Sequence, residues 1–413
     1  MAVLILVAGC VLSGVVLDDA PPASAAPGES TVPAPNPDLA ASCGIDIHVV
    51  LDRSGSIAQS GATQQVQSAF RAFVSALRNT GSRMSVSQFS SIAELPIGQY
   101  TTVTDATIAS TFEPYIASFR PEGYTHWEDG FRVPRYFAPR PDPARPHLVL
   151  FITDGNPNTV ARTDRVTYDP GNPNVAQNLY ELQLPLTEAQ TQHLQDNESG
   201  RNQATKPAVA NANALKGEGS HVLAVAVGDG LSGGSTLQRL SAISGPDVYS
   251  GTGTFDISTA DVYRVADFDL LEAALRDAAF QLCAPSVNIR KLVDVNPDPV
   301  IDDLQPGQGW TMQATVDPVP ASWVLPAGAG GPSATADTDP TGFVNFQWNT
   351  SAPVPSSVTV AEVQQPGFMP DPAETTCIYI TPEITDPQPL PDFVSTPGGF
   401  SGTVPEDAIV TIG

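Results

Sequence analysis

Short apolar runs alternate with amphipathic stretches over the first two thirds of the chain. Residues 45–51, 147–153 and 222–227 are apolar runs with the length of buried strands. Residues 64–77 and 269–282 instead repeat apolar side chains at helical spacing. Buried strands that alternate with amphipathic helices are typical of a mostly parallel sheet covered on both faces. We therefore predict an α/β, doubly wound, Rossmann-like fold for this part of the chain.

Further elements in this region follow from the same reasoning. Residues 84–89 alternate as a strand, and residues 106–119 and 128–137 are expected to be helical. Residues 159–200 are polar and show no clear period, so we interpret them as an insertion over the edge where the parallel strands end.

After Cys283 the pattern changes to short strands separated by proline-rich turns. This spacing predicts a second, all-β sandwich domain over residues 284–413. Its candidate strands lie at residues 287–295, 310–316, 342–348, 357–363 and 375–380, with a last strand that begins at residue 408.

The N-terminus predicts export. Residues 1–17 are uncharged and almost wholly apolar, and small residues precede a cleavage point after Ala25, so residues 1–25 are interpreted as a signal peptide. Two alternatives stay open, a lipidated Cys10 and an uncleaved N-terminal anchor. All three place the protein outside the cytoplasm, either secreted or at the cell surface in association with the envelope. Residues 26–42, rich in Pro, Ala and Ser, are expected to form a flexible linker.

The composition fits an acidic globular protein. Of the 413 residues, 44 are Asp or Glu and 19 are Lys or Arg, which gives a net charge of −25. Nucleic acid is therefore excluded as a partner, because phosphate binding needs a basic face.

Two of the four cysteines flank the predicted α/β domain. Cys43 precedes its first strand and Cys283 follows its last helix, so a disulfide between them would join the two ends of the domain over residues 43–283. The alternative is a pair of buried free thiols.

Five oxygen-bearing side chains form a motif in three parts. Asp52, Ser54 and Ser56 follow the first strand, Thr125 lies in a loop before a helix, and Asp154 ends another strand. The carboxyl ends of parallel strands share one edge of a sheet, so these side chains are expected to meet there. Two carboxylates and three hydroxyls suit a hard divalent cation that keeps one coordination position open, with Mg²⁺ first, Mn²⁺ next and Ca²⁺ less suited.

With these residues in order, the sequence resembles the von Willebrand factor A family. The metal-ion-dependent adhesion site (MIDAS) of that family has the form Asp-x-Ser-x-Ser, then Thr, then Asp, and all five positions match. The resemblance covers about residues 43–283. It implies a metal site at Asp52, Ser54, Ser56, Thr125 and Asp154 that a carboxylate of a protein or matrix ligand completes.

The second domain resembles the prealbumin-like and collagen-adhesin B-type domains of bacterial surface proteins. The likeness rests on the segments 338–346 and 358–368. It implies an isopeptide bond from an early-strand Lys to a last-strand Asn, assisted by an acid, with Lys291 and Glu362 in the first and third roles. The last strand reaches Gly413 without an Asn, so the bond lacks its third member. The favoured alternative is a solvated Lys291 and a Glu362 at the end of a strand, and truncation of the domain at Gly413 stays open.

No motif predicts an enzyme. The five histidines have no metal-ligand spacing, and His-Glu-x-x-His does not occur. We therefore predict a non-catalytic, adhesin-like surface protein. The alternative is a structural or assembly component of the cell envelope or a pilus, in which the cation only stabilises the domain.

Overall fold

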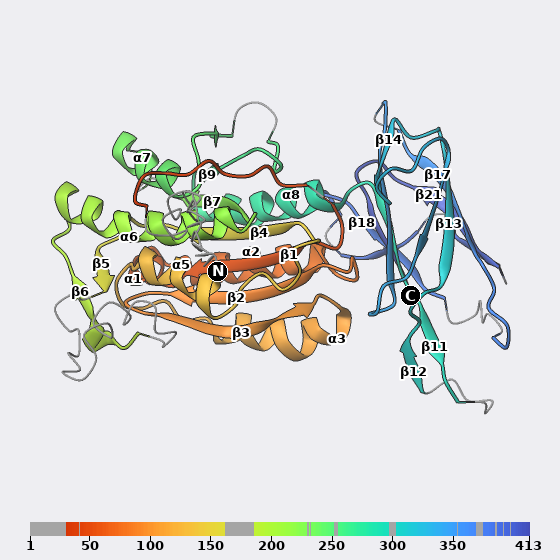
Figure 1. Ribbon diagram of the computed structural model, residues 1–413, viewed down its shortest axis with the longest axis horizontal. Coiled ribbons are helices and arrows are strands. Elements are labelled where there is room, and N and C mark those ends of the chain that lie inside the picture. Colours follow the sequence, from red (N-terminus) through yellow and green to blue (C-terminus); the bar gives the residue numbers. More distant parts are fainter. Residues whose placement is uncertain are drawn as a thin grey trace, which may run out of the picture.

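The computed structural model consists of an α/β part and a β-sandwich, joined end to end (Figure 1). It describes residues 30–40, 42–161, 186–228, 231, 233–251, 255–296, 303–352, 354–368, 375–384, 386–390, 392–396 and 398–413. The predicted signal peptide, and the possible lipidation site at Cys10, lie outside these residues.

A seven-stranded sheet forms the centre of the α/β part. Its order is β3-β2-β1-β4-β7-β9-β8, and every described pair is parallel except β2 with β3. The strands are β1 (Asp46–Asp52), β2 (Arg83–Phe89), β3 (Ala93–Thr102), β4 (His147–Thr153), β7 (His221–Val227), β8 (Val248–Tyr249) and β9 (Val262–Val265). Because β1 pairs with β2 on one side and with β4 on the other, the strand order reverses at β1. Such a switch point leaves a crevice at the carboxyl ends of the strands.

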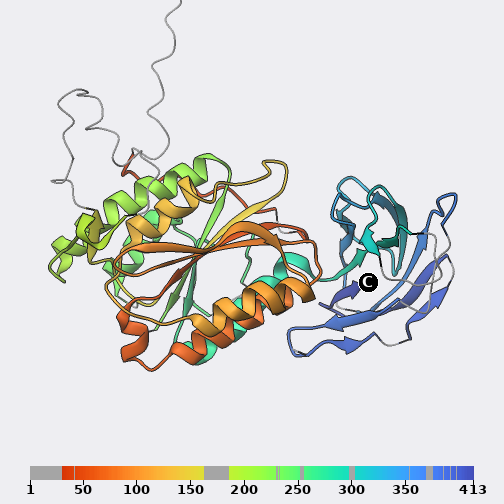
Figure 2. The same cartoon turned by 90° about the horizontal axis from the view of Figure 1, so that it is seen from below.

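Helices cover both faces of this sheet, as Figure 2 shows. One apolar core joins α2 and α8 to the first face, and another joins α5, α6 and α7 to the second. The helices are α1 (Gly55–Gln59), α2 (Thr63–Ala76), α3 (Asp105–Thr107) continued by a π-helical turn and α4 (Glu113–Ser118), α5 (Trp127–Tyr136), α6 (Glu198–Gly217), α7 (Gly234–Ile243) and α8 (Leu271–Cys283). The doubly wound, mostly parallel fold predicted from the sequence is therefore confirmed.

The polar insertion contains a short hairpin. Strands β5 (Thr159–Ala161) and β6 (Thr191–His193) pair antiparallel, and α6 begins at Glu198. Between the two strands, residues 162–185 lie outside the described part, so the prediction for that stretch is not addressed.

The expectation of a flexible linker over residues 26–42 does not hold for residues 30–39. This segment lies along α6 and β7, where Asn213 and Lys216 donate to its carbonyl groups and Asn36 pairs with the backbone of Val222. Leu39 is buried in the core. The prediction was wrong here because side-chain hydrogen bonds fix a segment that has no apolar period of its own.

The second part of the chain is a β-sandwich. A six-stranded sheet of order β14-β16-β10-β22-β18-β19 and a five-stranded sheet of order β15-β13-β17-β21-β20 enclose one apolar core. The strands are β10 (Ser286–Arg290), β13 (Thr311–Asp317), β14 (Ser322–Leu325), β15 (Ser333–Asp337), β16 (Phe343–Asn349), β17 (Ser356–Glu362), β18 (Cys377–Ile380), β19 (Gln388–Pro389), β20 (Val394–Thr396), β21 (Gly399–Val404) and β22 (Ile409–Ile412). A separate hairpin, β11 (Leu292–Asp294) with β12 (Leu304–Pro306), divides the single strand that we expected over residues 287–295.

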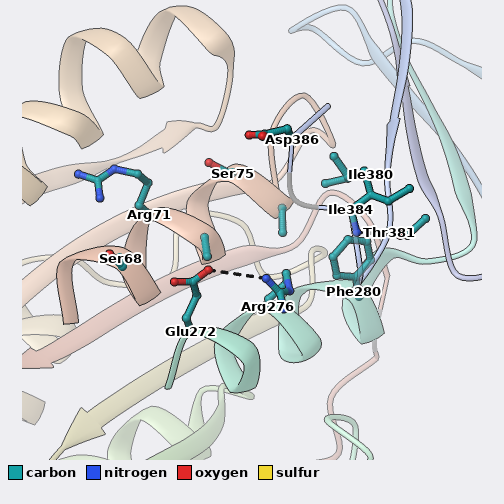
Figure 3. Close-up of a pocket in the computed structure, with 12 residues that line it drawn as sticks. Ser68, Arg71, Ser75, Glu272, Arg276, Phe280, Ile380, Thr381, Ile384 and Asp386 are labelled. Atoms are coloured by element: carbon teal, nitrogen blue, oxygen red, sulfur yellow. Dashed lines mark hydrogen bonds and ion pairs between the residues drawn. The ribbon is translucent and has the colours of Figure 1, made fainter. Parts of the chain in front are cut away.

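The sandwich contacts the end of the α/β part where the parallel strands begin. Gln347 accepts a hydrogen bond from the amide of Cys43, and Asn345 donates to the carbonyl of Thr80. Beside this junction, a cleft of about 270 Å³ lies between α2, α8 and the segment after β18, with Arg276 and Glu272 on its wall (Figure 3). The carboxyl ends of the strands lie at the opposite edge of the sheet and are left open by the sandwich.

A disulfide joins Cys43 to Cys283, with 4.5 Å between the two Cα atoms. It connects the segment before β1 to the last residue of α8, as predicted from the positions of the two cysteines. Cys377 is a buried free thiol. Among the described residues, no helix has the length and apolar character needed to cross a bilayer.

Candidate metal site

Four of the five predicted metal ligands are joined by hydrogen bonds. Asp52 ends β1, and its Oδ1 accepts from the amide of Ser54 at 2.7 Å, which turns the chain at once toward α1. The hydroxyls of Ser54 and Ser56 lie 3.0 Å apart. Ser56 Oγ in turn donates to Oδ1 of Asp154, which follows β4, at 2.7 Å. The two ends of the motif therefore meet between β1 and β4.

The hydroxyl of Thr125 lies close to that of Ser56, as their distances from Gly155 indicate. A Cβ atom added at Gly155 would lie 3.5 Å from Oγ1 of Thr125 and 3.8 Å from Oγ of Ser56. Two hydroxyls from loops that are distant in sequence thus converge on one small space next to Asp154. A side chain at position 155 would fill that space, so glycine keeps it open.

The two carboxylates lie in an environment that is short of positive charge. Burial, and then the proximity of Asp154, raise the pKa of Asp52 to about 7, and burial also raises the pKa of Asp154. Within the described residues, neither carboxylate is paired with Lys or Arg; the guanidinium of Arg53 pairs with Glu94 and Glu122 instead. Buried negative charge, hydroxyl oxygens and a small open space together fit a hard divalent cation.

Several residues that the sequence reasoning did not single out fix this arrangement. Thr153 donates to Oδ2 of Asp52 at 2.6 Å, so both carboxylate oxygens are held. Asn158 exchanges hydrogen bonds with the backbone of Thr125, accepting from its amide at 2.9 Å and donating to its carbonyl at 3.0 Å. Two of these residues could have been suspected from the sequence. Thr153 directly precedes Asp154, and Asn158 lies in a turn cluster after it. Arg239 of α7, which donates to Asn156, gave none.

The start of α5 forms a buried polar group directly behind Thr125. His126, Glu128 and Asp129 are almost inaccessible to solvent. The ring of His126 is hydrogen-bonded to the carbonyl of Ser91, Glu128 accepts from the amide of Ala161, and Asp129 accepts from the amide of Ala93. The ring of His126 is fully buried, so it is not exposed beside Thr125. Through these three side chains, the start of α5 is hydrogen-bonded to the backbone of Ser91, Ala93 and Ala161.

Among the described residues, no three or more His, Cys, Asp or Glu side chains form a group that could hold a metal ion. His48 and His147 are buried within the sheet, and burial holds the pKa of each at about 3, so both are neutral at ordinary pH.

Lys291 and Glu362 lie together in the sandwich. Nζ of Lys291 is 2.9 Å from Oε2 of Glu362 and 4.3 Å from the centroid of the Trp310 ring. The structure thus contains an ion pair at the two positions named for the isopeptide.

The comparison with family models agrees with the fold. Residues 46–176 match the model of the von Willebrand factor type A domain, a range that contains all five motif residues. The chain contains a von Willebrand factor type A domain. No curated protein sequence matches the chain.

Several solved structures overlap the chain at low identity. The PilB minor pilin from Streptococcus sanguinis is 16% identical with a TM-score of 0.43, over 58% of this chain and 61% of that one. The vWF domain of the type V pili tip protein Mfa5 from Porphyromonas gingivalis is 15% identical with a TM-score of 0.39, over 58% and 94%. Proximal thread matrix protein 1 from the mussel byssus, solved with a zinc-occupied MIDAS motif, is 17% identical with a TM-score of 0.35, over 58% and 46%. The chain therefore spans less than two thirds of the length of the minor pilin and of the mussel protein.

Proposed function

We propose that this protein is an exported, adhesin-like surface protein that binds a partner through a divalent cation held by Asp52, Ser54, Ser56, Thr125 and Asp154. The observation that carries the proposal is the set of hydrogen bonds from Ser54 through Ser56 to Asp154, which the hydroxyl of Thr125 approaches beside Gly155. When bound, the cation supplies a positive charge with an open position for a carboxylate oxygen of the partner. Mg²⁺ is the first candidate, Mn²⁺ the second, and Ca²⁺ is less suited to so compact a set.

The protein's own residues would orient the site. Thr153 and the amide of Ser54 fix the Asp52 carboxylate, and Asn158 fixes the loop of Thr125. Because the ligands are held before a partner arrives, little conformational entropy is lost on binding. We therefore infer a non-catalytic role, in which these side chains hold the cation and the cation binds the partner.

The arrangement of the two domains supports a location at the cell surface. We assign residues 43–283 to the von Willebrand factor A domain and residues 284–413 to a prealbumin-like sandwich that acts as a stalk. The sandwich contacts the edge of the sheet opposite to the metal loops, so it leaves them accessible. The Cys43–Cys283 disulfide is the kind of bond that persists in oxidising compartments, in agreement with export through residues 1–25.

The test uses the full chain and two readouts. Titration with Mn²⁺ measures the metal site directly, and capture of partners from matrix and envelope extracts is compared in Mg²⁺ and in EDTA. We expect Asp52→Ala to abolish Mn²⁺ binding and capture, whereas Asp386→Ala, an exposed aspartate beside the junction cleft, retains both.

Two outcomes decide against the proposal. Capture that is unaffected by EDTA and by Asp52→Ala would exclude a metal-dependent adhesin. Binding of Mn²⁺ that raises the melting temperature while no ligand is retained would favour the alternative, a structural or assembly component of the envelope or a pilus.

A further inference from the structure

Two exposed rings are stacked on each other at the edge of the sheet that carries the metal motif. The centroids of Tyr124 and His193 lie 4.0 Å apart, with 20° between the ring planes. The side chain of Tyr124 is 50% exposed, and His193 is exposed as well. An exposed aromatic pair of this kind offers apolar area to a partner while its rings are already ordered.

The backbone holds both rings in place. His193 ends β6 and pairs with Thr159 of β5. The next residue, Leu194, donates from its amide to the carbonyl of Asn158 at 2.8 Å and packs against Val160 and Ala204. Strand β6 is therefore held by its pairing with β5 and by the contacts of Leu194.

Tyr124 is fixed by the metal loop itself. Its amide donates to Oγ of Ser91 at 3.2 Å, and the next residue is Thr125, the third part of the metal motif. The loop of Thr125 is in turn bonded to Asn158, whose carbonyl accepts from Leu194. One short set of hydrogen bonds thus connects the backbone beside the stacked rings to the loop of Thr125. We refer to the two rings as the rim of the site.

We propose that the Tyr124–His193 pair is a second contact of the metal site, which takes a planar aromatic side chain next to the acidic residue of the partner. This inference rests on the proposed function, since the acidic residue is the group that the cation receives. A peptide that brings its carboxylate to the oxygen cluster carries its neighbouring side chain to the rim. An aromatic ring there packs against the stacked pair, whereas a methyl group gains almost nothing.

The probes are two capped dipeptides, acetyl-Asp-Phe-amide and acetyl-Asp-Ala-amide, titrated into the full chain in Mg²⁺. For the native protein we expect the Phe peptide to bind about three- to tenfold more tightly, the range expected for one additional aromatic contact. The ratio of the two affinities is the readout, because it cancels any change in the affinity for the metal.

Variants assign the preference to the two rings. Tyr124→Ala and His193→Ala should each bring the ratio close to one, and Tyr124→Phe, which keeps the ring, should restore it. Phe368→Ala serves as the matched control, because Phe368 is an exposed ring, 43% accessible, on the sandwich. Its ratio should equal that of the native protein.

Equal affinities of the two peptides for the native protein, or a preference that survives Tyr124→Ala, overturn the inference. Failure of both peptides to bind overturns it too. A parallel titration with Mn²⁺ distinguishes failure of the rim contact from failure of the metal site. If Mn²⁺ binds, only the rim contact is rejected. If Mn²⁺ does not bind, the proposed metal site is rejected as well.

Discussion

Oγ of Ser56 donates a 2.7 Å hydrogen bond to Oδ1 of Asp154, although the two residues are 98 positions apart. This bond joins the turn after β1 to the turn after β4 across the switch point of the sheet. A serine hydroxyl that bonds a buried carboxylate in this way can also present its oxygen to a cation. The bond therefore brings the first and last parts of the motif into direct contact.

Ser56→Ala tests the role of this hydroxyl. The substitution removes one oxygen of the proposed site, and we expect the affinity for Mn²⁺ to fall by at least about tenfold, as is common when the surroundings of a metal are altered. Isothermal titration of the purified protein provides the measurement. Ser60→Ala is the control, because Ser60 caps the C-terminus of the same short helix and its hydroxyl donates to the carbonyl of Ile57. Equal affinities for the two variants would remove Ser56 from the site.

Two aspartates at opposite ends of β1 are expected to behave differently. Asp46, the first residue of the strand, is fully buried and makes two 2.7 Å bonds to Arg83. Asp46→Asn should lower the free energy of unfolding by about 3 kcal/mol, because it breaks a largely buried ion pair, and should leave Mn²⁺ binding unchanged. Asp52→Asn, at the last residue, should abolish Mn²⁺ binding without a comparable loss of stability in EDTA.

Urea unfolding and Mn²⁺ titration of both variants give the comparison. The assignment of Asp52 to the metal would be contradicted if Asp52→Asn destabilised the metal-free protein as much as Asp46→Asn does.

His48 and His147 make the stability dependent on pH. Burial, with a smaller effect of a neighbouring positive charge, lowers the pKa of both to about 3 from an ordinary value of 6.5. Between these values the unfolded chain binds protons that the folded chain excludes. Stability from this source is therefore constant above about pH 6.5 and falls as the pH drops toward 3, by up to about 1.4 kcal/mol per pH unit for each histidine.

Urea midpoints at pH 5 and pH 7.5 measure this slope. His147→Gln keeps a polar group near its partners, Tyr100 and Ser220, but does not titrate. We expect the variant to lose less stability than the native protein between the two pH values. An unchanged slope would show that other groups dominate acid unfolding.

Much of the α/β part could be predicted because its signals are local. The apolar runs that became β1, β4 and β7 are buried along their whole length, and the five motif residues follow the strands and loops expected of them. Strand β3 was missed because it lies at the edge of the sheet, where half-exposed positions give no continuous apolar run. Helix α6 was missed because alanine and asparagine form much of its buried face.

The residues that support the site are harder to read from a sequence. Asn158 and Arg239 are polar residues whose importance comes from partners in other loops, 33 and 83 positions away. The same applies to residues 30–39, whose order depends on α6 and β7. Contacts of this kind follow from the tertiary fold and leave no periodic pattern in the chain.

Reduction of the Cys43–Cys283 disulfide should destabilise the protein. The bond closes a loop of 240 residues, and the loop-entropy model gives a stabilisation on the order of 5 kcal/mol. We expect dithiothreitol to lower the urea midpoint of the native chain and to leave that of the Cys43→Ala, Cys283→Ala double variant unchanged. Cys377→Ala is the control, since the thiol of Cys377 is free and its pKa is raised by burial to about 12. It should respond to reductant as the native protein does.

Gln347 is the side chain that we expect to hold the sandwich to the α/β part. Its Oε1 accepts from the amide of Cys43 at 2.9 Å and its Nε2 donates to the carbonyl of Leu282 at 3.2 Å, so one buried amide bonds the backbone beside both halves of the disulfide. Gln347→Ala removes both bonds, and hydrogen exchange should accelerate around residues 42–46 while strand β4 remains protected. Gln313→Ala, an exposed position on the other sheet of the sandwich, should leave both segments unchanged. A uniform increase in exchange across β1 and β4 would instead show that Gln347 supports the fold of the α/β part as a whole.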